Sequence, residues 1–143
     1  MTIPSWPEWF MAHARVAATK SKDSTQVGAA LVAPGGFVAL TAYNGPPKGV
    51  DDIPMRRERP TKYLFASHAE ANAVAFAARA GIKTEGCAMY VTHYPCASCA
   101  RTLIQAGIKS VHVGPGKTSM PAEEFEAAAV MFYEAGVFVE EVV

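Results

Sequence analysis

Two short segments of this chain carry side chains that bind metals and move protons. His68 and Glu70 stand two residues apart in His-Ala-Glu, and Cys96 and Cys99 stand three apart directly after Pro95. Each segment opens a stretch with helical spacing, so the two cysteines project from the same helix face. The partial positive charge at a helix N-terminus favours the thiolate form in which cysteine binds metals. His68, Cys96 and Cys99 therefore offer three ligands for a zinc tetrahedron.

Three protein ligands leave one zinc position open for water, which distinguishes a catalytic zinc site from a structural one. Zinc lowers the pKa of a bound water from about 15.7 to near 7, which makes hydroxide available at neutral pH. Glu70 is expected to face the same cavity as His68, where its carboxylate moves protons between the water and a substrate. His-x-Glu followed by Pro-Cys-x-x-Cys is typical of zinc enzymes that deaminate nucleobases.

A structural zinc site is the alternative interpretation, and it requires a fourth protein ligand. Cys87 and His93 are the candidates. Cys87 falls in a predicted strand and is interpreted as an ordinary buried cysteine. His93 comes directly before Tyr94 and Pro95, so we expect it either to line the pocket or to orient a neighbouring group.

The elements that must position these residues follow from the hydrophobic pattern. Residues 44–65 are rich in glycine, proline and charge, which predicts a long loop, and a loop of that length is often functional. Alternation of helices and strands predicts one α/β domain over residues 1–143, with a three-layer α/β/α architecture in which helices cover both faces of a sheet. The predicted helices cover 5–20, 68–80, 96–106 and 121–135, and the predicted strands cover 26–33, 37–43, 87–92, 111–113 and 137–142.

Composition narrows the choice of partners and compartment. The 13 Lys and Arg residues equal the 13 Asp and Glu residues, which argues against a polynucleotide partner. No apolar run is long enough to span a membrane, and residues 1–7 show no secretory signal. Three cysteines with a Cys-x-x-Cys pair indicate metal chemistry in a reducing compartment more than disulfides. We therefore expect a cytoplasmic protein with neither a membrane nor a polynucleotide as partner.

Beyond the zinc motifs, the sequence resembles the deoxycytidylate (dCMP) deaminase family of the cytidine deaminase-like superfamily. The Ser-Lys-Asp…Gln-Val-Gly and Asn-Gly-x-Pro blocks separate this family from other zinc deaminases. The resemblance covers nearly the whole chain in register, through residues 9–11, 21–29, 43–49, 68–73, 90–96 and 104–109.

The resemblance implies a cytidine deaminase-like fold with a mixed five-stranded sheet flanked by helices. It also implies conversion of dCMP to dUMP with release of ammonia. It implies that Asn44 contacts the nucleotide sugar and that the backbone amide of Ala69 lies near the pyrimidine oxygen. It also implies that Tyr94 lies beside the base and that Pro95 helps to fix the carbonyl that faces the amine.

The resemblance also bears on metal number, regulation and assembly. Some phage members bind a second, structural zinc through a cysteine after Ser-Lys and histidines in the following loop. Here Asp23 follows Ser21-Lys22, and residues 44–67 contain no histidine, so one zinc ion is predicted. Many members are activated by dCTP and inhibited by dTTP, and Lys20, Lys22 and Asn72, together with Asn44, resemble parts of that apparatus. Family members are oligomers, so a homo-oligomer is expected.

A substrate with a 5′-phosphate needs hydroxyl, cationic or backbone donors. Ser24 is the preferred single candidate, as a hydroxyl near the phosphate. Asp51 and Asp52 are interpreted as an exposed loop pair. Thr25 is a further hydroxyl candidate. The basic residues near the predicted pocket are cationic candidates for the phosphate, although each alone is interpreted as a solvated loop charge: Lys22, Lys48, Arg56, Arg57, Arg59 and Lys62.

Other functions stay open at this point. A deaminase of a free nucleoside or of a modified dCMP, such as the 5-methyl form, would use the same zinc chemistry. A tRNA adenosine deaminase would flip its base into the same kind of pocket. A catalytically silent zinc module is a further alternative, although it would have no need of Glu70.

Overall fold

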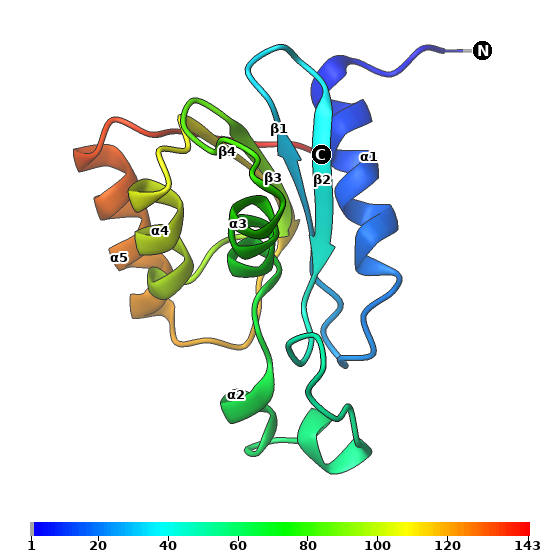
Figure 1. Ribbon diagram of the computed structural model, residues 1–143. Helices are drawn as coiled ribbons and strands as arrows, with labels where there is room; N and C mark the ends of the chain where they lie inside the picture. The colour runs from blue at the N-terminus through cyan, green and yellow to red at the C-terminus, as the bar shows by residue number, and fades with distance from the viewer. Residues whose placement is uncertain (1) are drawn as a thin grey trace.

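A mixed five-stranded sheet forms the centre of the molecule (Figure 1). The computed structural model describes residues 2–143. The strand order is β2-β1-β3-β4-β5. β1 runs antiparallel to both β2 and β3, whereas β4 runs parallel to both β3 and β5. The strands are β1 (Gly28–Val32), β2 (Val38–Tyr43), β3 (Ala88–His93), β4 (Ser110–Gly116) and β5 (Phe138–Glu141).

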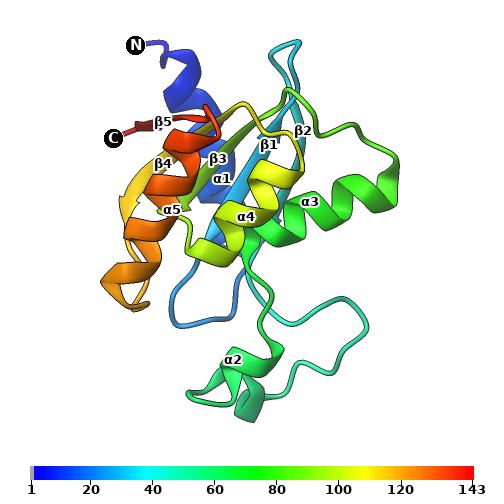
Figure 2. The ribbon, with the colours of Figure 1, turned by 90° about the vertical axis from the view of Figure 1, so that its left-hand side faces the viewer.

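Helices cover both faces of this sheet, which confirms the predicted three-layer architecture. One face is covered by α1 (Trp6–Ala18). The other face carries three helices side by side, as Figure 2 shows: α3 (Ala69–Ala80), α4 (Ala97–Gln105) and α5 (Ala122–Glu134). Among residues 2–143, no helix is both long and apolar enough to cross a membrane.

Helix α1 begins at a capping box and packs unusually close to the sheet. The Ser5 hydroxyl accepts a hydrogen bond from the Glu8 amide, and the Glu8 carboxylate accepts one from the Ser5 amide. A Cβ atom on Gly28 would lie 1.9 Å from the Ala14 carbonyl oxygen, so β1 needs glycine there. The helix ends at Ala18, two residues before its predicted end.

The larger part of the core lies between the sheet and the helices α3, α4 and α5. Leu31, Met89 and Val111 point into it from three neighbouring strands, and Leu103 and Phe132 point into it from α4 and α5. All five side chains are almost completely buried. This packing fixes where α3 and α4 begin, and those two helix starts carry the predicted zinc ligands.

The segment predicted as one long loop contains helical structure. A 3₁₀ helix, η1 (Pro54–Arg57), and a short helix, α2 (Lys62–Phe65), form a lobe that projects from one end of the sheet (Figure 1). Because the segment is rich in proline and charged residues, its sequence pattern predicts a loop and does not indicate η1 or α2. The interpretation of Lys62 as a solvated loop charge is wrong, because this residue is only 6% exposed.

Candidate active site

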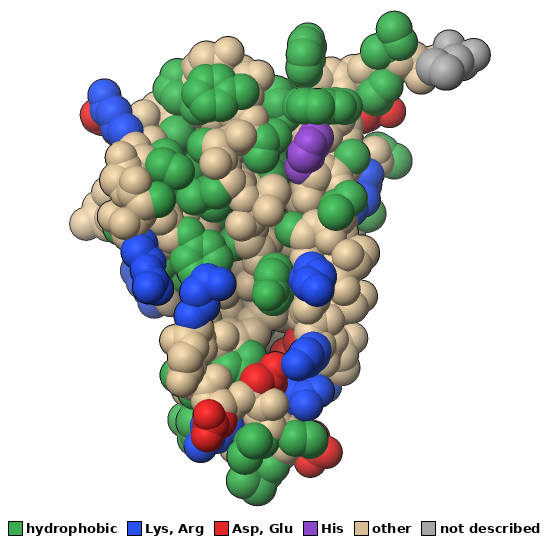
Figure 3. Space-filling view, turned by 45° about the vertical axis from the view of Figure 1, so that its right-hand side comes forward, with side chains coloured by type: hydrophobic (Ala, Val, Ile, Leu, Met, Phe, Trp, Pro, Cys, Tyr) green, Lys and Arg blue, Asp and Glu red, His purple; other side chains and the backbone are tan. Residues whose placement is uncertain are grey.

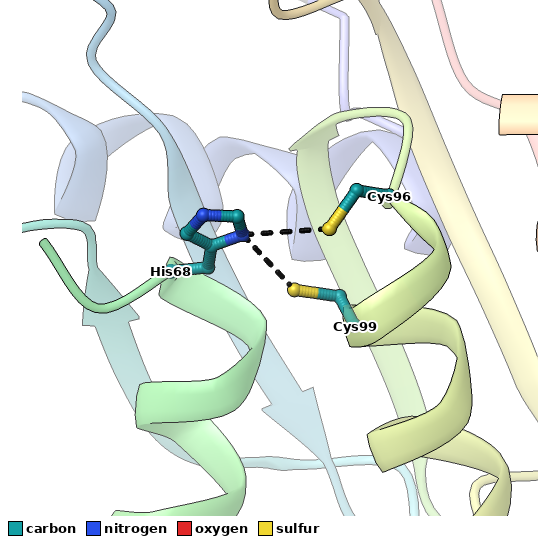
Figure 4. Close-up of side chains that lie close together, drawn as sticks. All are labelled: His68, Cys96 and Cys99. Atoms are coloured by element: carbon teal, nitrogen blue, oxygen red, sulfur yellow. Dashed lines mark hydrogen bonds between the residues drawn. The ribbon is translucent and has the colours of Figure 1, made fainter. Parts of the chain in front are cut away.

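The three predicted zinc ligands meet at the N-termini of two neighbouring helices (Figure 4). His68 is the N-cap residue of α3, and Cys96 is the N-cap residue of α4. Cys99 lies in the first turn of α4. The Nδ1 atom of His68 lies 3.3 Å from the Cys99 sulfur and 3.5 Å from the Cys96 sulfur. The ligand atoms of all three residues lie within 4.8 Å of one another.

These spacings fit a zinc ion. With Zn–N near 2.0 Å and Zn–S near 2.3 Å, a tetrahedral angle separates nitrogen from sulfur by about 3.5 Å. Both nitrogen–sulfur distances in the structure are close to that value. One imidazole and two thiols are also a donor set that zinc prefers. His68, Cys96 and Cys99 therefore form a cluster that is compatible with the predicted zinc ion.

Hydrogen bonding within the cluster prepares it for a cation. The hydrogen bond from Cys99, with a further contribution from His68, lowers the pKa of Cys96 to about 4. The same hydrogen bond to Cys96 raises the pKa of Cys99, and burial adds to the rise. The hydrogen bond to Cys96 also raises the pKa of His68. A lowered pKa at Cys96 favours the thiolate form in which cysteine binds metals.

Glu70 lies in the first turn of α3 and is 4% exposed. Burial raises the pKa of its carboxyl group. A carboxyl group whose pKa rises toward neutrality is suited to both accepting and returning a proton. Ala69, between Glu70 and the ligand His68, is fully buried. Its backbone N–H belongs to the first turn of the helix, where amides have no intrahelical acceptor.

His68 and Cys96 of the metal cluster line one cavity of about 530 Å³ together with Glu70. Asn44, Ala69 and Tyr94, three of the predicted substrate contacts, line it together with His93. The remaining lining residues come from the segment before β1, from the α2 lobe and from the loop between β4 and α5: Asp23, Thr25, Val27, Arg59, Lys62, Tyr63, Ala66, Thr118, Ser119, Met120 and Pro121.

Asn44 holds the cavity wall together. Its side-chain oxygen accepts a hydrogen bond from the Val27 amide at 3.0 Å, and its side-chain nitrogen donates to the Thr25 carbonyl at 2.9 Å. The amide thus ties the end of β2 to the segment before β1. Each of its two polar atoms retains capacity for one further hydrogen bond.

Three other predicted residues do not line this cavity. Pro95 is completely buried directly before the ligand Cys96. Ser24 is exposed, although its neighbours Asp23 and Thr25 both line the cavity. Asn72 donates a hydrogen bond to the Tyr43 carbonyl at 2.8 Å, so it connects α3 to the end of β2.

A second cavity of about 170 Å³ lies beside the first. Asp23, Asn44 and Ala66 line both cavities and form the wall between them. Lys20 and Lys22, two of the predicted regulatory residues, line the second cavity together with Arg56 and Arg57. Asp52 lies 3.4 Å from Lys22 and 3.1 Å from Arg57, so this member of the predicted exposed pair takes part in ion pairing.

Sequence reasoning missed four contacts that shape the site. Lys62 and Asp23 form a buried ion pair, with 3.0 Å between nitrogen and oxygen. Arg59 donates hydrogen bonds to the hydroxyls of Tyr63 and Ser119 at 2.7 and 3.2 Å. In addition, the Glu124 carboxylate of α5 accepts a hydrogen bond from the Ala97 amide at the start of α4. Only the Glu124 contact had a local signal in the sequence, namely acidic residues in the first turn of a predicted helix. The contacts of Lys62 and Arg59 had none.

The three-layer fold and the His-Cys-Cys cluster beside a buried glutamate define a zinc-binding deaminase. Residues 4–115 match the family model for the cytidine and deoxycytidylate deaminase zinc-binding region. The chain belongs to this family, as the sequence resemblance predicted.

Named relatives and a solved structure agree with this assignment. The deoxycytidylate deaminase of Mus musculus is 44% identical over 139 residues, which cover 92% of this chain and 76% of the mouse protein. The human deoxycytidylate deaminase is 42% identical with the same coverage. A dCMP deaminase from the cyanophage S-TIM5, solved with dCMP and dUMP, is 25% identical with a TM-score of 0.80. That match covers 99% of this chain and all of the phage chain.

Proposed function

We propose that this protein is a zinc-dependent hydrolase that converts dCMP and water to dUMP and ammonia. The observation that carries the proposal is the cluster of His68, Cys96 and Cys99 beside a cavity whose wall contains His68, Cys96 and the buried Glu70. The relatives named as deoxycytidylate deaminases and the dCMP-bound phage structure support the choice of nucleotide.

The residues around the cavity have different roles in the proposed reaction. When bound by His68, Cys96 and Cys99, zinc supplies an activated water for attack on the ring carbon that carries the amine. The Glu70 carboxylate takes a proton from that water and delivers it to the ring nitrogen. It then takes the proton of the hydroxyl now on the ring carbon and transfers it to the amine. The amine leaves as ammonia while the ring carbon becomes a carbonyl. Burial of Glu70 excludes bulk water from these transfers.

Groups next to the zinc ligands and Glu70 orient the substrate. The Ala69 amide at the start of α3 is free to donate to the pyrimidine oxygen. The half-buried Tyr94 ring packs beside the base, and the buried Pro95 helps to fix the carbonyl that faces the amine. Asn44 uses its remaining hydrogen-bonding capacity for the sugar. A role for the exposed Ser24 at the phosphate stays a prediction.

The test offers dCMP, deoxycytidine, CMP, dCTP and 5-methyl-dCMP separately to zinc-loaded protein and follows each product by chromatography. Rapid conversion of dCMP to dUMP, with slow turnover of deoxycytidine, is expected. The Glu70→Gln variant is expected to retain zinc and to lose about 10²- to 10⁴-fold in turnover, the usual contribution of general acid–base catalysis. Glu126→Gln, on the exposed side of α5, is the matched control. Intact dCMP in the presence of fully zinc-loaded protein would refute the proposal.

The second cavity is the proposed site of nucleotide regulation by dCTP and dTTP. Four basic side chains line it: Lys20, Lys22, Arg56 and Arg57. The Asp52 carboxylate forms ion pairs with two of them, Lys22 and Arg57. Asn72 supports this site indirectly, since it holds the end of β2. Addition of dCTP is expected to raise dCMP turnover and dTTP to lower it, and Lys20→Ala is expected to weaken both effects. If dCMP turnover is insensitive to both dCTP and dTTP, the proposal that the second cavity is a regulatory site is refuted.

We further propose a cytoplasmic homo-oligomer. Free thiols at Cys96 and Cys99 need a reducing compartment. Trp6 is 68% exposed and Trp9 is 40% exposed on α1. Figure 3 shows hydrophobic side chains gathered at the end of the molecule that carries the N-terminus. An exposed aromatic patch of this kind favours a subunit contact. Light scattering measures the mass of the oligomer and tests this subunit contact. The Trp6→Ser variant is expected to form a smaller species than the parent protein.

A further inference from the structure

Arg59 and Lys62 are the two lysine or arginine side chains in the wall of the large cavity, among residues 2–143. Both come from the lobe that holds η1 and α2, and the sequence offers each as a cationic candidate for the phosphate while favouring a solvated loop charge. Their surroundings in the structure differ sharply, and the difference decides which of them is available to a substrate anion.

The charge of Lys62 is already neutralised. Its ammonium lies 3.0 Å from the Asp23 carboxylate, with the two side chains 8% and 7% exposed. The same carboxylate oxygen accepts the Thr25 amide at 2.9 Å, which fixes its position. A phosphate bound at Lys62 would also lie against the buried Asp23 carboxylate, and like charges at short range repel strongly in a poorly solvated site.

Arg59, in contrast, has neutral partners. Its Nε donates to the Tyr63 hydroxyl at 2.7 Å, and one terminal nitrogen donates to the Ser119 hydroxyl at 3.2 Å. Within residues 2–143, no carboxylate lies within ion-pair distance of this guanidinium. The two hydroxyls come from segments 56 residues apart, α2 and the loop before α5, and they hold the side chain at the cavity wall.

This arrangement suits a tetrahedral oxyanion. The guanidinium retains N–H groups that are free to donate in pairs to phosphate oxygens. The Tyr63 and Ser119 hydroxyls accept from Arg59, and each hydroxyl hydrogen can rotate to donate to the same anion. Because the three groups are held in place before binding, little side-chain entropy is lost when an anion arrives.

We propose that Arg59, with the hydroxyls of Tyr63 and Ser119, binds the 5′-phosphate of the substrate and selects a nucleoside monophosphate over a nucleoside. This inference rests on the proposed function, because it assigns the phosphate of the same substrate. It assigns the phosphate to Arg59 in the large cavity, in place of the exposed Ser24 or the lysines that line the second cavity.

The test measures binding of dUMP and of deoxyuridine to the zinc-loaded protein by calorimetry, together with kcat/KM for dCMP. Arg59→Gln is expected to weaken dUMP binding about 10- to 100-fold, the usual contribution of a charge-assisted pair, and to leave deoxyuridine binding unchanged. Inorganic phosphate is expected to compete with dUMP in the parent protein at lower concentration than in Arg59→Gln. Tyr63→Phe, which leaves the guanidinium less firmly held, is expected to show a smaller loss.

The matched control is Arg79→Gln, which removes an exposed arginine at the end of α3. It is expected to bind dUMP as the parent protein does. Parent protein that deaminates dCMP, together with Arg59→Gln that binds dUMP equally well, would overturn the phosphate assignment alone. Parent protein that leaves dCMP intact would instead overturn the proposed function, and the phosphate assignment with it.

Discussion

The Lys62 ammonium donates a hydrogen bond to the Asp23 carboxylate at 3.0 Å, across 39 residues of sequence. Both side chains are almost fully buried beside the large cavity. The pair fastens the α2 lobe to the segment that leads into β1. A buried ion pair is costly to break on one side only, because the remaining charge is left without a partner.

Lys62→Met is therefore expected to lower the free energy of unfolding by about 3–5 kcal/mol. Urea unfolding of the zinc-loaded protein measures the change. The double variant with Asp23→Asn and Lys62→Met is the control. It removes both charges, while the amide oxygen introduced at position 23 would still accept the Thr25 N–H, so it should recover most of the loss. Equal destabilisation of the single and double variants would contradict this account.

Zinc binding is expected to stabilise the folded chain. Cys96→Ser should lose zinc, measured by atomic absorption after dialysis, whereas Cys87→Ala should retain it. Cys87 is buried and donates to the Lys83 carbonyl, apart from the ligand cluster. A chelator should lower the Tm of the parent protein, since zinc at about 1,000 times its Kd contributes about 4 kcal/mol. Unchanged Tm after zinc removal would show that the metal plays no part in stability.

Close packing of α1 on β1 leads to a prediction at Gly28. A Cβ atom there would approach the Ala14 oxygen to 1.9 Å and the Ala18 nitrogen to 2.5 Å. Since these are backbone atoms, Gly28→Ala should destabilise the fold by about 3 kcal/mol, at the upper end of the usual cost of overpacking. Gly45→Ala is the control, because a Cβ atom there would meet nothing within 4 Å. Chemical denaturation of both variants makes the comparison.

His112 should make stability depend on pH. Burial lowers the pKa of its imidazole, although the nearby Glu140 carboxylate opposes that shift. The neutral ring donates from Nδ1 to Glu140 at 2.6 Å and accepts at Nε2 from the Ser110 hydroxyl at 2.9 Å. Since the unfolded chain takes up a proton first, this contribution to stability is complete above the unfolded pKa of about 6.5 and is lost as pH falls.

Thermal unfolding between about pH 5.5 and 7.5 tests the effect of His112. The parent protein is expected to lose stability toward the acidic end, and His112→Gln should show a shallower slope. An identical slope in the two proteins would rule out His112 as the source.

Local sequence was sufficient for the metal cluster and for most of the elements. His68 and Cys96 each cap a helix, and Cys99 follows one turn later, so helical spacing alone predicted that the two sulfurs face the same way. The Ser5 capping box, the Gly81 helix end and the strand patterns are equally local signals. Each depends on residues only a few positions apart, which is the range over which backbone preferences act.

Only the tertiary structure decided which charges are free. Lys62 and Arg59 lie three residues apart and look alike in the sequence. The first is neutralised by Asp23, 39 residues away, and the second is held by Ser119, 60 residues away. Whether a charge is buried, paired or available depends on segments that meet only when the sheet and its lobe have assembled. The sequence by itself therefore determined the chemistry of the zinc site, and folding decided how the rest of the cavity is charged.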